Sequence, residues 1–183
     1  MDTLSDNALM QKVKDGDFDK MSLLYERHYR QLFGYLFKMT KQKEASEDMV
    51  QNVFFRMLKY RNSFKGGGEF RTWMYHVARN VLNDHYHNAK RIPSNTDLHE
   101  FEGRMEEGMP ADEKIEKEQA VETLMKAMEK LSEDNRELLI LCRYQDLKYQ
   151  EIAQILNTSE AAIKVRVHRA MNELKSAFLK IEN

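Results

Sequence analysis

Cysteine and proline are nearly absent from this sequence, and their scarcity limits what the chain can be. The single cysteine, Cys142, has no partner for an intramolecular disulfide, and the histidines have no paired cysteines with which to form a zinc finger. We therefore expect no disulfide scaffold, no metal site and no cofactor. Proteins without disulfides are typical of a reducing cytoplasm, which is the expected location.

Long apolar runs are also missing. No segment approaches the ~20 apolar residues that a membrane-spanning helix needs, and residues 1–17 lack the apolar core of a signal peptide. We therefore expect neither secretion nor insertion into a membrane. Hydrophobic residues make up 42% of the chain and charged residues 32%, a composition that is ordinary for a folded globular protein.

Glycine and proline are sparse enough to mark boundaries. Residues 111–183 contain neither, whereas both prolines bracket residues 93–110, a stretch without helical periodicity. No segment alternates polar and apolar residues with a period of two, so we expect no strands. The predicted fold is all-α, with two small helical domains at residues 1–91 and 113–183, joined by a flexible acidic linker at residues 92–112.

Apolar residues recur at steps of three and four through both predicted domains, which is typical of helices with one buried face. Ser5 and Ser132 are expected to cap the helices that follow them. The expected helices lie at about residues 5–16, 18–40, 44–60, 70–90, 112–130, 132 onward, 149–157 and 160–179.

The net charge of −1 hides a strong segregation of charge. Residues 56–91 carry eight Lys and Arg against two acids, whereas residues 94–122 carry three against ten. The basic block suggests a surface that faces phosphates. The acidic block is either a regulatory tether or a solvated stretch without a specific role.

Residues 149–157 and 160–179 have the spacing of a helix-turn-helix, with Ser159 placed to cap the second helix. One face of the second helix is apolar, and the other is formed by Lys164, Val165, His168, Arg169, Asn172 and Lys175. A packed helix with a cationic face suits the major groove of duplex DNA. A plain helical hairpin with a solvated basic face has the same pattern.

Residues 62–81, NSFKGGGEFRTWMYHVARNV, place three glycines directly before another amphipathic helix. Its inward face is predicted to hold Trp73, Met74, Val77, Ala78, Val81 and Leu82. Its exposed face is predicted to hold Tyr75, His76, Arg79, Asn80, Asn83, Tyr86 and His87. Rings and amides suit unpaired bases, because stacking on aromatic side chains tolerates any base sequence. A surface helix with a few tyrosines is the alternative, and it leaves the glycine loop without a role.

No catalytic centre is predicted. The segment KGGGEFRT lacks the spacing of a phosphate-binding loop, and no strand precedes it. His85 and His87 diverge by about 160° on a helix, so they do not form the pair that a helical metal site uses. Glu47 and Asp48 have no partner base, which favours capping, solvation or a protein contact.

The helix-turn-helix and the helix that follows the glycines both resemble parts of bacterial RNA polymerase sigma factors of the extracytoplasmic-function (ECF) group. Residues 48–54, DMVQNVF, and residues 70–80, FRTWMYHVARN, are similar to region 2 of that family, and residues 131–174 resemble its region 4. The resemblance covers nearly the whole chain. It implies an alternative sigma factor that directs the polymerase core to promoters and assists strand opening, and its implied partners are the core enzyme, promoter DNA and an anti-sigma factor.

The resemblance also implies site residues. The loop at residues 64–70 would capture a base flipped from the nontemplate strand of the minus-ten element, with Phe64 as a wall of the pocket. The largest polymerase subunit would be contacted by Asp48, Gln51, Asn52 and Phe55. The minus-ten strand would be contacted by Phe64, Lys65, Gly66, Phe70, Tyr75, His76, Arg79, Asn80 and Asn83. The minus-thirty-five duplex would be contacted by Ser159, Lys164, Val165, His168 and Arg169.

Two other functions stay open at this point. A regulator that binds duplex operators as a dimer would use residues 1–91 as a sensor, and a helical interaction protein would present basic faces to an acidic partner. A sigma factor differs from both in needing a single-strand surface as well as a duplex surface.

Lys148 stands where the family usually has a capping serine at the start of the first helix of the helix-turn-helix. This difference should cost about 1 kcal/mol of local helix stability.

Overall fold

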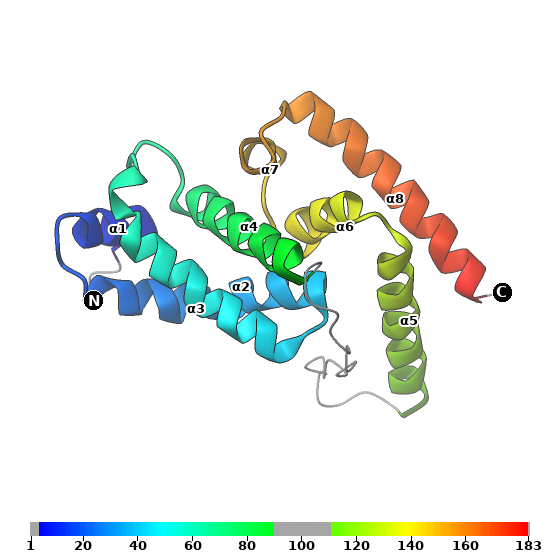
Figure 1. Ribbon diagram of the computed structural model, residues 1–183. Helices are drawn as coiled ribbons and strands as arrows, with labels where there is room; N and C mark the ends of the chain where they lie inside the picture. Colours follow the sequence, from blue (N-terminus) through cyan, green and yellow to red (C-terminus); the bar gives the residue numbers. More distant parts are fainter. Residues whose placement is uncertain (1–3, 90–110, 183) are drawn as a thin grey trace. The chain divides into compact units, whose positions relative to one another are not determined.

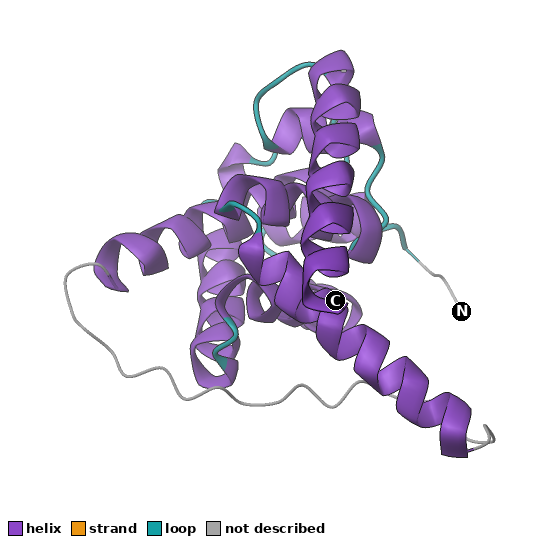
Figure 2. Ribbon diagram, turned by 90° about the vertical axis from the view of Figure 1, so that its right-hand side faces the viewer, coloured by secondary structure: helices purple, strands orange, loops and turns teal. Residues whose placement is uncertain are grey.

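The computed structural model describes residues 4–89 and 111–182, and every regular element in those ranges is a helix (Figure 1, Figure 2). The all-α prediction is therefore confirmed. The chain divides into two compact units, the first built from α1–α4 and the second mainly from α5–α8. The predicted linker at residues 92–112 lies outside the described residues except for its last two positions, which begin α5.

The helix bounds follow the predicted ranges closely. The first unit contains α1 (Asp6–Lys14), α2 (Lys20–Thr40), α3 (Lys43–Lys59), a short 3-10 turn η1 (Arg61–Ser63) and α4 (Phe70–Ala89). The second contains α5 (Ala111–Lys130), α6 (Glu133–Leu139), a π-helical turn η2 (Ile140–Tyr144), α7 (Tyr149–Ile155) and α8 (Glu160–Glu182).

In the first unit, α2, α3 and α4 form the core, and α1 packs against both α2 and α4. The side of α3 that faces this core holds Met49, Val53, Phe54 and Met57, which are all buried. Ser5 caps α1 as expected, because its Oγ accepts a hydrogen bond of 3.2 Å from the backbone N–H of Ala8. Lys41 ends α2 in a left-handed conformation with φ of 59°, and its N–H donates to the Phe37 carbonyl.

In the second unit, α8 packs along α5 and α6. Arg136 of α6 joins these elements, because its guanidinium donates to the carbonyls of Met128, Glu129 and Leu131 at 3.0, 2.9 and 3.2 Å. Those carbonyls lie at the end of α5, where backbone acceptors have no partner within their own helix. One side chain therefore caps α5 and fixes the turn into α6.

The helix-turn-helix prediction matches the geometry of α7 and α8. Ser159 caps α8, with its Oγ accepting a 3.1 Å hydrogen bond from the N–H of Ala162. At the start of α7, the backbone N–H of Lys148 donates to Glu151 Oε2 at 2.7 Å. A carboxylate three positions into the helix thus satisfies a terminal N–H, which offsets part of the cost expected from the missing serine.

Candidate nucleic-acid interface

The glycine loop between η1 and α4 has fixed ends and an open tip. Gly66 adopts a left-handed φ of +69°, which is accessible to glycine at little cost. A Cβ added at Gly67 or Gly68 would meet nothing within 4 Å, so the backbone there is open to an approaching ligand. Lys65 and the three glycines are all exposed.

Aromatic rings support this loop from inside the unit. Phe64 is 2% exposed and Phe70 is 1% exposed, so neither offers a ring face to solvent in this structure. The Phe64 ring lies 5.3 Å from that of Trp73, measured between centroids, and Trp73 Nε1 donates to Ser63 Oγ at 3.3 Å. Trp73, expected to be inward, is partly exposed, whereas the rings of Phe64 and Phe70 beside it are buried.

The exposed face of α4 is largely as predicted. His76, Asn80 and Asn83 are exposed, and Arg79 is partly exposed. The prediction that Tyr75 lies on this face is wrong, because Tyr75 is fully buried and meets Tyr35 edge-on with centroids 5.6 Å apart. The reason is that α4 contacts α1, α2 and α3, so its buried arc is wider than the half-circle expected for a surface helix.

Four residues predicted to contact polymerase form one exposed strip on α3. Asp48, Gln51, Asn52 and Phe55 are spaced by three and four residues and are all exposed, and the Phe55 side chain is 63% exposed. A groove of about 510 Å³ borders the strip between α3 and α4. Asp48 and Asn52 line this groove, together with Arg56 and Asp84, whose side chains form an ion pair at 2.7 Å.

Aromatic side chains line α2 where it packs against α3. The rings of Tyr25, Tyr29 and Phe33 follow one another at helical spacing along α2, and Tyr25 also contacts Phe54 of α3. Burial raises the pKa of Tyr29 above its ordinary value, and the nearby Glu47 and Tyr25 raise it further. The Tyr29 hydroxyl therefore remains neutral, and the strip on α3 gains no charge from it.

The predicted duplex-binding face of α8 is exposed. Lys164, Val165, His168 and Arg169 are all exposed, while Ile163, Val167, Ala170 and Leu174 on the opposite face are buried. An acidic residue lies at the start of this face of α8. Glu160 forms an ion pair with Lys164 at 2.9 Å. A phosphate or base that binds Lys164 therefore competes with this carboxylate for the ammonium group.

Comparison with known proteins identifies the family. Residues 24–92 match the family model for Sigma-70 region 2, and residues 122–174 match that for Sigma-70, region 4. RNA polymerase sigma factor YlaC of Bacillus subtilis is 31% identical over 163 residues, covering 88% of this chain and 94% of YlaC. ECF RNA polymerase sigma factor SigX of the same species is 29% identical over 161 residues, covering 86% and 82%. The chain is an ECF sigma factor.

Solved structures of similar fold agree with this sigma-factor architecture. CnrH, solved in complex with the cytosolic domain of CnrY, aligns over 97% of this chain and 99% of its own, with a TM-score of 0.71 at 21% identity. The sigma factor RpoE of Bartonella quintana, solved with the anti-sigma factor NepR, aligns over 91% and 99%, with a TM-score of 0.66 at 23% identity.

As an alternative sigma factor, the protein directs RNA polymerase to promoters, and its partners are the polymerase core and promoter DNA. The region 2 match covers α3 and α4, so residues 1–91 are not simply a sensor attached to a duplex reader. The alternative of a self-sufficient operator-binding regulator is therefore excluded. The region 2 match begins inside α2 and leaves α1 outside it.

The described residues contain neither a metal-binding cluster nor a membrane-spanning helix. Within residues 4–89 and 111–182, no three His, Cys, Asp or Glu side chains are grouped to hold a metal ion. No helix in the same ranges has the length and apolar character needed to cross a membrane.

Proposed function

We propose that this sigma factor divides promoter recognition between its two units. Residues 1–91 bind the polymerase core through the α3 strip and hold the unpaired minus-ten strand with the glycine loop and α4, whereas residues 113–183 bind the minus-thirty-five duplex through α8. The observation that carries the proposal is the presence of two different surfaces on separate units. One offers amides and a ring beside an open glycine loop, and the other offers cations along a packed helix.

Strand opening follows from the first surface. Extracting a base from the stack costs a few kcal/mol, so the protein must return that energy through stacking and hydrogen bonds. Trp73 supplies a ring, Asn80 and Asn83 supply amides, and Lys65 supplies a cation for the adjacent phosphate. The protein performs no chemistry of its own in this scheme, because binding energy alone shifts the promoter toward the open form.

The proposal also covers where the protein acts and what controls it. It acts in the cytoplasm, and an anti-sigma factor controls it. The support for such a partner is that CnrH and the Bartonella RpoE share this fold, and both were solved bound to a second protein, CnrY and the anti-sigma factor NepR respectively.

Replacing Asn80 by alanine should reduce open-complex formation on duplex promoters roughly tenfold, because a base edge left without a partner costs about 1–3 kcal/mol. Binding to the core enzyme should not change, since Asn80 is exposed on α4 and is not one of the α3 residues expected to contact the core. Permanganate reactivity of unpaired thymines measures opening, at promoters found by mapping transcript starts. Gln31→Ala, which removes an exposed amide from α2, is the control. Loss of core binding by Asn80→Ala would mean that the site is misplaced.

Combined replacement of Lys164 and Arg169 by alanine should weaken upstream recognition tenfold or more, because each contact with a base or phosphate contributes about 1–3 kcal/mol. Lys180→Ala removes an exposed cation near the C-terminal end of α8, about three helical turns beyond Arg169, and should have little effect. Transcription from matched reporters with and without the minus-thirty-five element shows whether the loss depends on that element. If the double variant is equally impaired on the reporter that lacks this element, α8 is not the duplex reader.

A further inference from the structure

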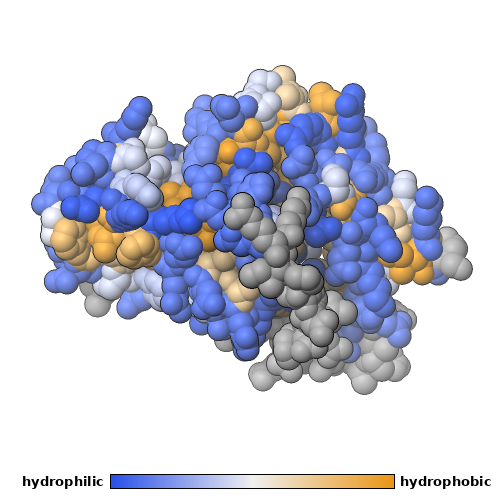
Figure 3. Space-filling view, in the orientation of Figure 1, coloured by the Kyte–Doolittle hydropathy of each residue, from blue (hydrophilic) through white to orange (hydrophobic). Residues whose placement is uncertain are grey.

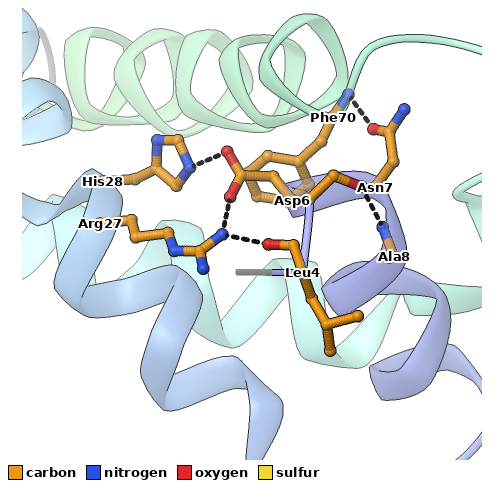
Figure 4. A network of polar contacts seen from close by, with 8 residues as sticks. Leu4, Asp6, Asn7, Ala8, Arg27, His28 and Phe70 are labelled. Carbon is orange, nitrogen blue, oxygen red and sulfur yellow. Dashed lines mark hydrogen bonds and ion pairs between the residues drawn. The ribbon is translucent and has the colours of Figure 1, made fainter. Parts of the chain in front are cut away.

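One face of α1 contacts both ends of the glycine loop. Asn7, Gln11 and Lys14 are spaced by four and three residues, so their side chains leave the helix on the same side. Asn7 Oδ1 accepts a 2.7 Å hydrogen bond from the backbone N–H of Phe70, where the loop enters α4 (Figure 4). Lys14 Nζ donates a 2.8 Å hydrogen bond to the carbonyl of Phe64, where the loop begins. Two side chains of one helix thus set the separation of the loop ends.

The third side chain lies beneath the middle of the loop. Gln11 Oε1 lies 3.4 Å from the point that a Cβ on Gly66 would occupy, so the loop backbone passes close over this amide. The Gln11 amide is itself held, because its Nε2 donates to Asp15 Oδ1 at 3.0 Å. Beyond Gly66, the positions of Gly67 and Gly68 have no such neighbour. The loop is therefore supported up to its tip and open at the tip.

A polar network in turn holds α1 against α2. The Asp6 carboxylate contacts Arg27 through one oxygen and His28 Nε2 through the other, both at 2.7 Å (Figure 4). Arg27 also donates to the Leu4 carbonyl at 2.8 Å. The His28 ring lies 5.1 Å from that of Phe70, so the network ends at the residue that Asn7 holds. Polar contacts thus link α2 to α1, and α1 to the backbone at both ends of the loop.

We propose that α1 is the positioning element for the base-capturing loop, and that Asn7 and Lys14 are its positioning residues. The inference rests on the proposed function of the loop. Its physical reason is entropic, because fixing a free backbone residue costs about 1–2 kcal/mol, and a loop with ordered ends has less freedom to lose when it closes on a base. The match to region 2 does not include α1, so the role rests on these contacts alone.

A purely structural role for the same contacts makes a different prediction. If Asn7 and Lys14 serve only to hold α1 in place, any change that weakens α1 equally should impair the protein equally. Ser5→Ala provides that comparison, because it removes the cap of α1, a change worth about 1 kcal/mol, without touching either hydrogen bond to the loop.

The test uses holoenzyme assembled from each variant and a bacterial polymerase core. The probe is a fluorescent single-stranded oligonucleotide that carries the minus-ten nontemplate sequence of a mapped promoter. Three measurements are made on every variant: oligonucleotide affinity, core affinity, and thermal unfolding of the free protein. The disrupting variants are Asn7→Ala and Lys14→Met, and the conservative variants are Asn7→Asp and Lys14→Arg. The stability control is Ser5→Ala. The direct-contact variant, which changes the loop and α4 together, is Lys65→Ala combined with Asn80→Ala.

We expect each disrupting variant to lose roughly fivefold in oligonucleotide affinity, the factor that one net hydrogen bond contributes, with core affinity unchanged. The conservative variants keep an acceptor at position 7 or a donor at position 14 and should restore affinity. Ser5→Ala should unfold earlier yet bind the oligonucleotide normally. The positioning role is overturned if the disrupting variants lose no more affinity than Ser5→Ala. If the direct-contact variant also binds normally, the proposed function of the loop and α4 fails instead.

Discussion

Replacing Phe64 by alanine is expected to lower the free energy of unfolding of the first unit by about 3–5 kcal/mol, the usual cost of deleting a buried ring. Phe64 is 2% exposed, and its ring contacts the rings of Phe70 and Trp73. Its loss leaves a cavity beneath the loop and removes the surface on which Trp73 rests. We therefore expect strand opening to fall together with stability.

Chemical denaturation followed by helical circular dichroism measures the change in stability. Lys65→Ala is the matched control, because this neighbouring side chain is exposed and surface changes usually stay within about 0.5 kcal/mol. A conservative Phe64→Leu variant should recover part of the loss. If Phe64→Ala is as stable as the parent but fails to open promoters, its ring contacts a base directly, as the family resemblance implied, and the burial seen here belongs only to the free protein.

The sequence was sufficient to predict the helices, because each signal lies within a few residues of its effect. Ser5, Ser132 and Ser159 each cap the helix that follows, and each accepts a backbone hydrogen bond three residues on. The faces of α3 and α8 were also predictable, since each helix buries one continuous stripe. Local chemistry decides these features, and tertiary contacts do not change them.

Features that depend on contacts between distant residues could not be predicted from local sequence patterns. Tyr75 was placed on the surface because a helical wheel assumes one packed side, whereas α4 has three neighbours. The contacts of α1 with the loop join residues 50 and 63 positions apart, and no local pattern marks them. The π-helical turn at Ile140–Tyr144 begins within the run Leu138–Leu141, which is buried without interruption and therefore has no periodicity to interpret.

Tertiary structure also separates two kinds of aromatic residue that look alike in the sequence. Phe54 and Phe55 are adjacent on α3, yet Phe54 is 6% exposed and Phe55 is 63% exposed. On the hydropathy surface, apolar residues appear only as patches among hydrophilic ones (Figure 3). Among the exposed large hydrophobic residues in the described part of the chain, Phe55 has the highest exposed fraction, so its ring is available to a partner.

Replacing Phe55 by alanine should weaken binding to the polymerase core by about 2 kcal/mol or more, which is roughly thirtyfold, because exposed aromatic anchors dominate protein interfaces. Asp48, Gln51 and Asn52 add exposed polar groups along the same strip of α3, and polar groups beside an apolar anchor are typical of such sites. The stability of the free protein should hardly change, since little of the Phe55 side chain is buried. The affinity for core enzyme is measured by fluorescence anisotropy of the labelled sigma factor, and thermal unfolding checks the fold.

Tyr60→Ala is the control for this change. Tyr60 is also an exposed aromatic residue at the end of α3, with its side chain 52% exposed, but it lies about 140° around the helix from Phe55. Removing its ring should leave core affinity unchanged, while Phe55→Leu should give an intermediate loss because a smaller apolar side chain remains. If Tyr60→Ala weakens core binding and Phe55→Ala does not, the polymerase approaches the other side of α3. The strip of Asp48, Gln51, Asn52 and Phe55 would then need another partner.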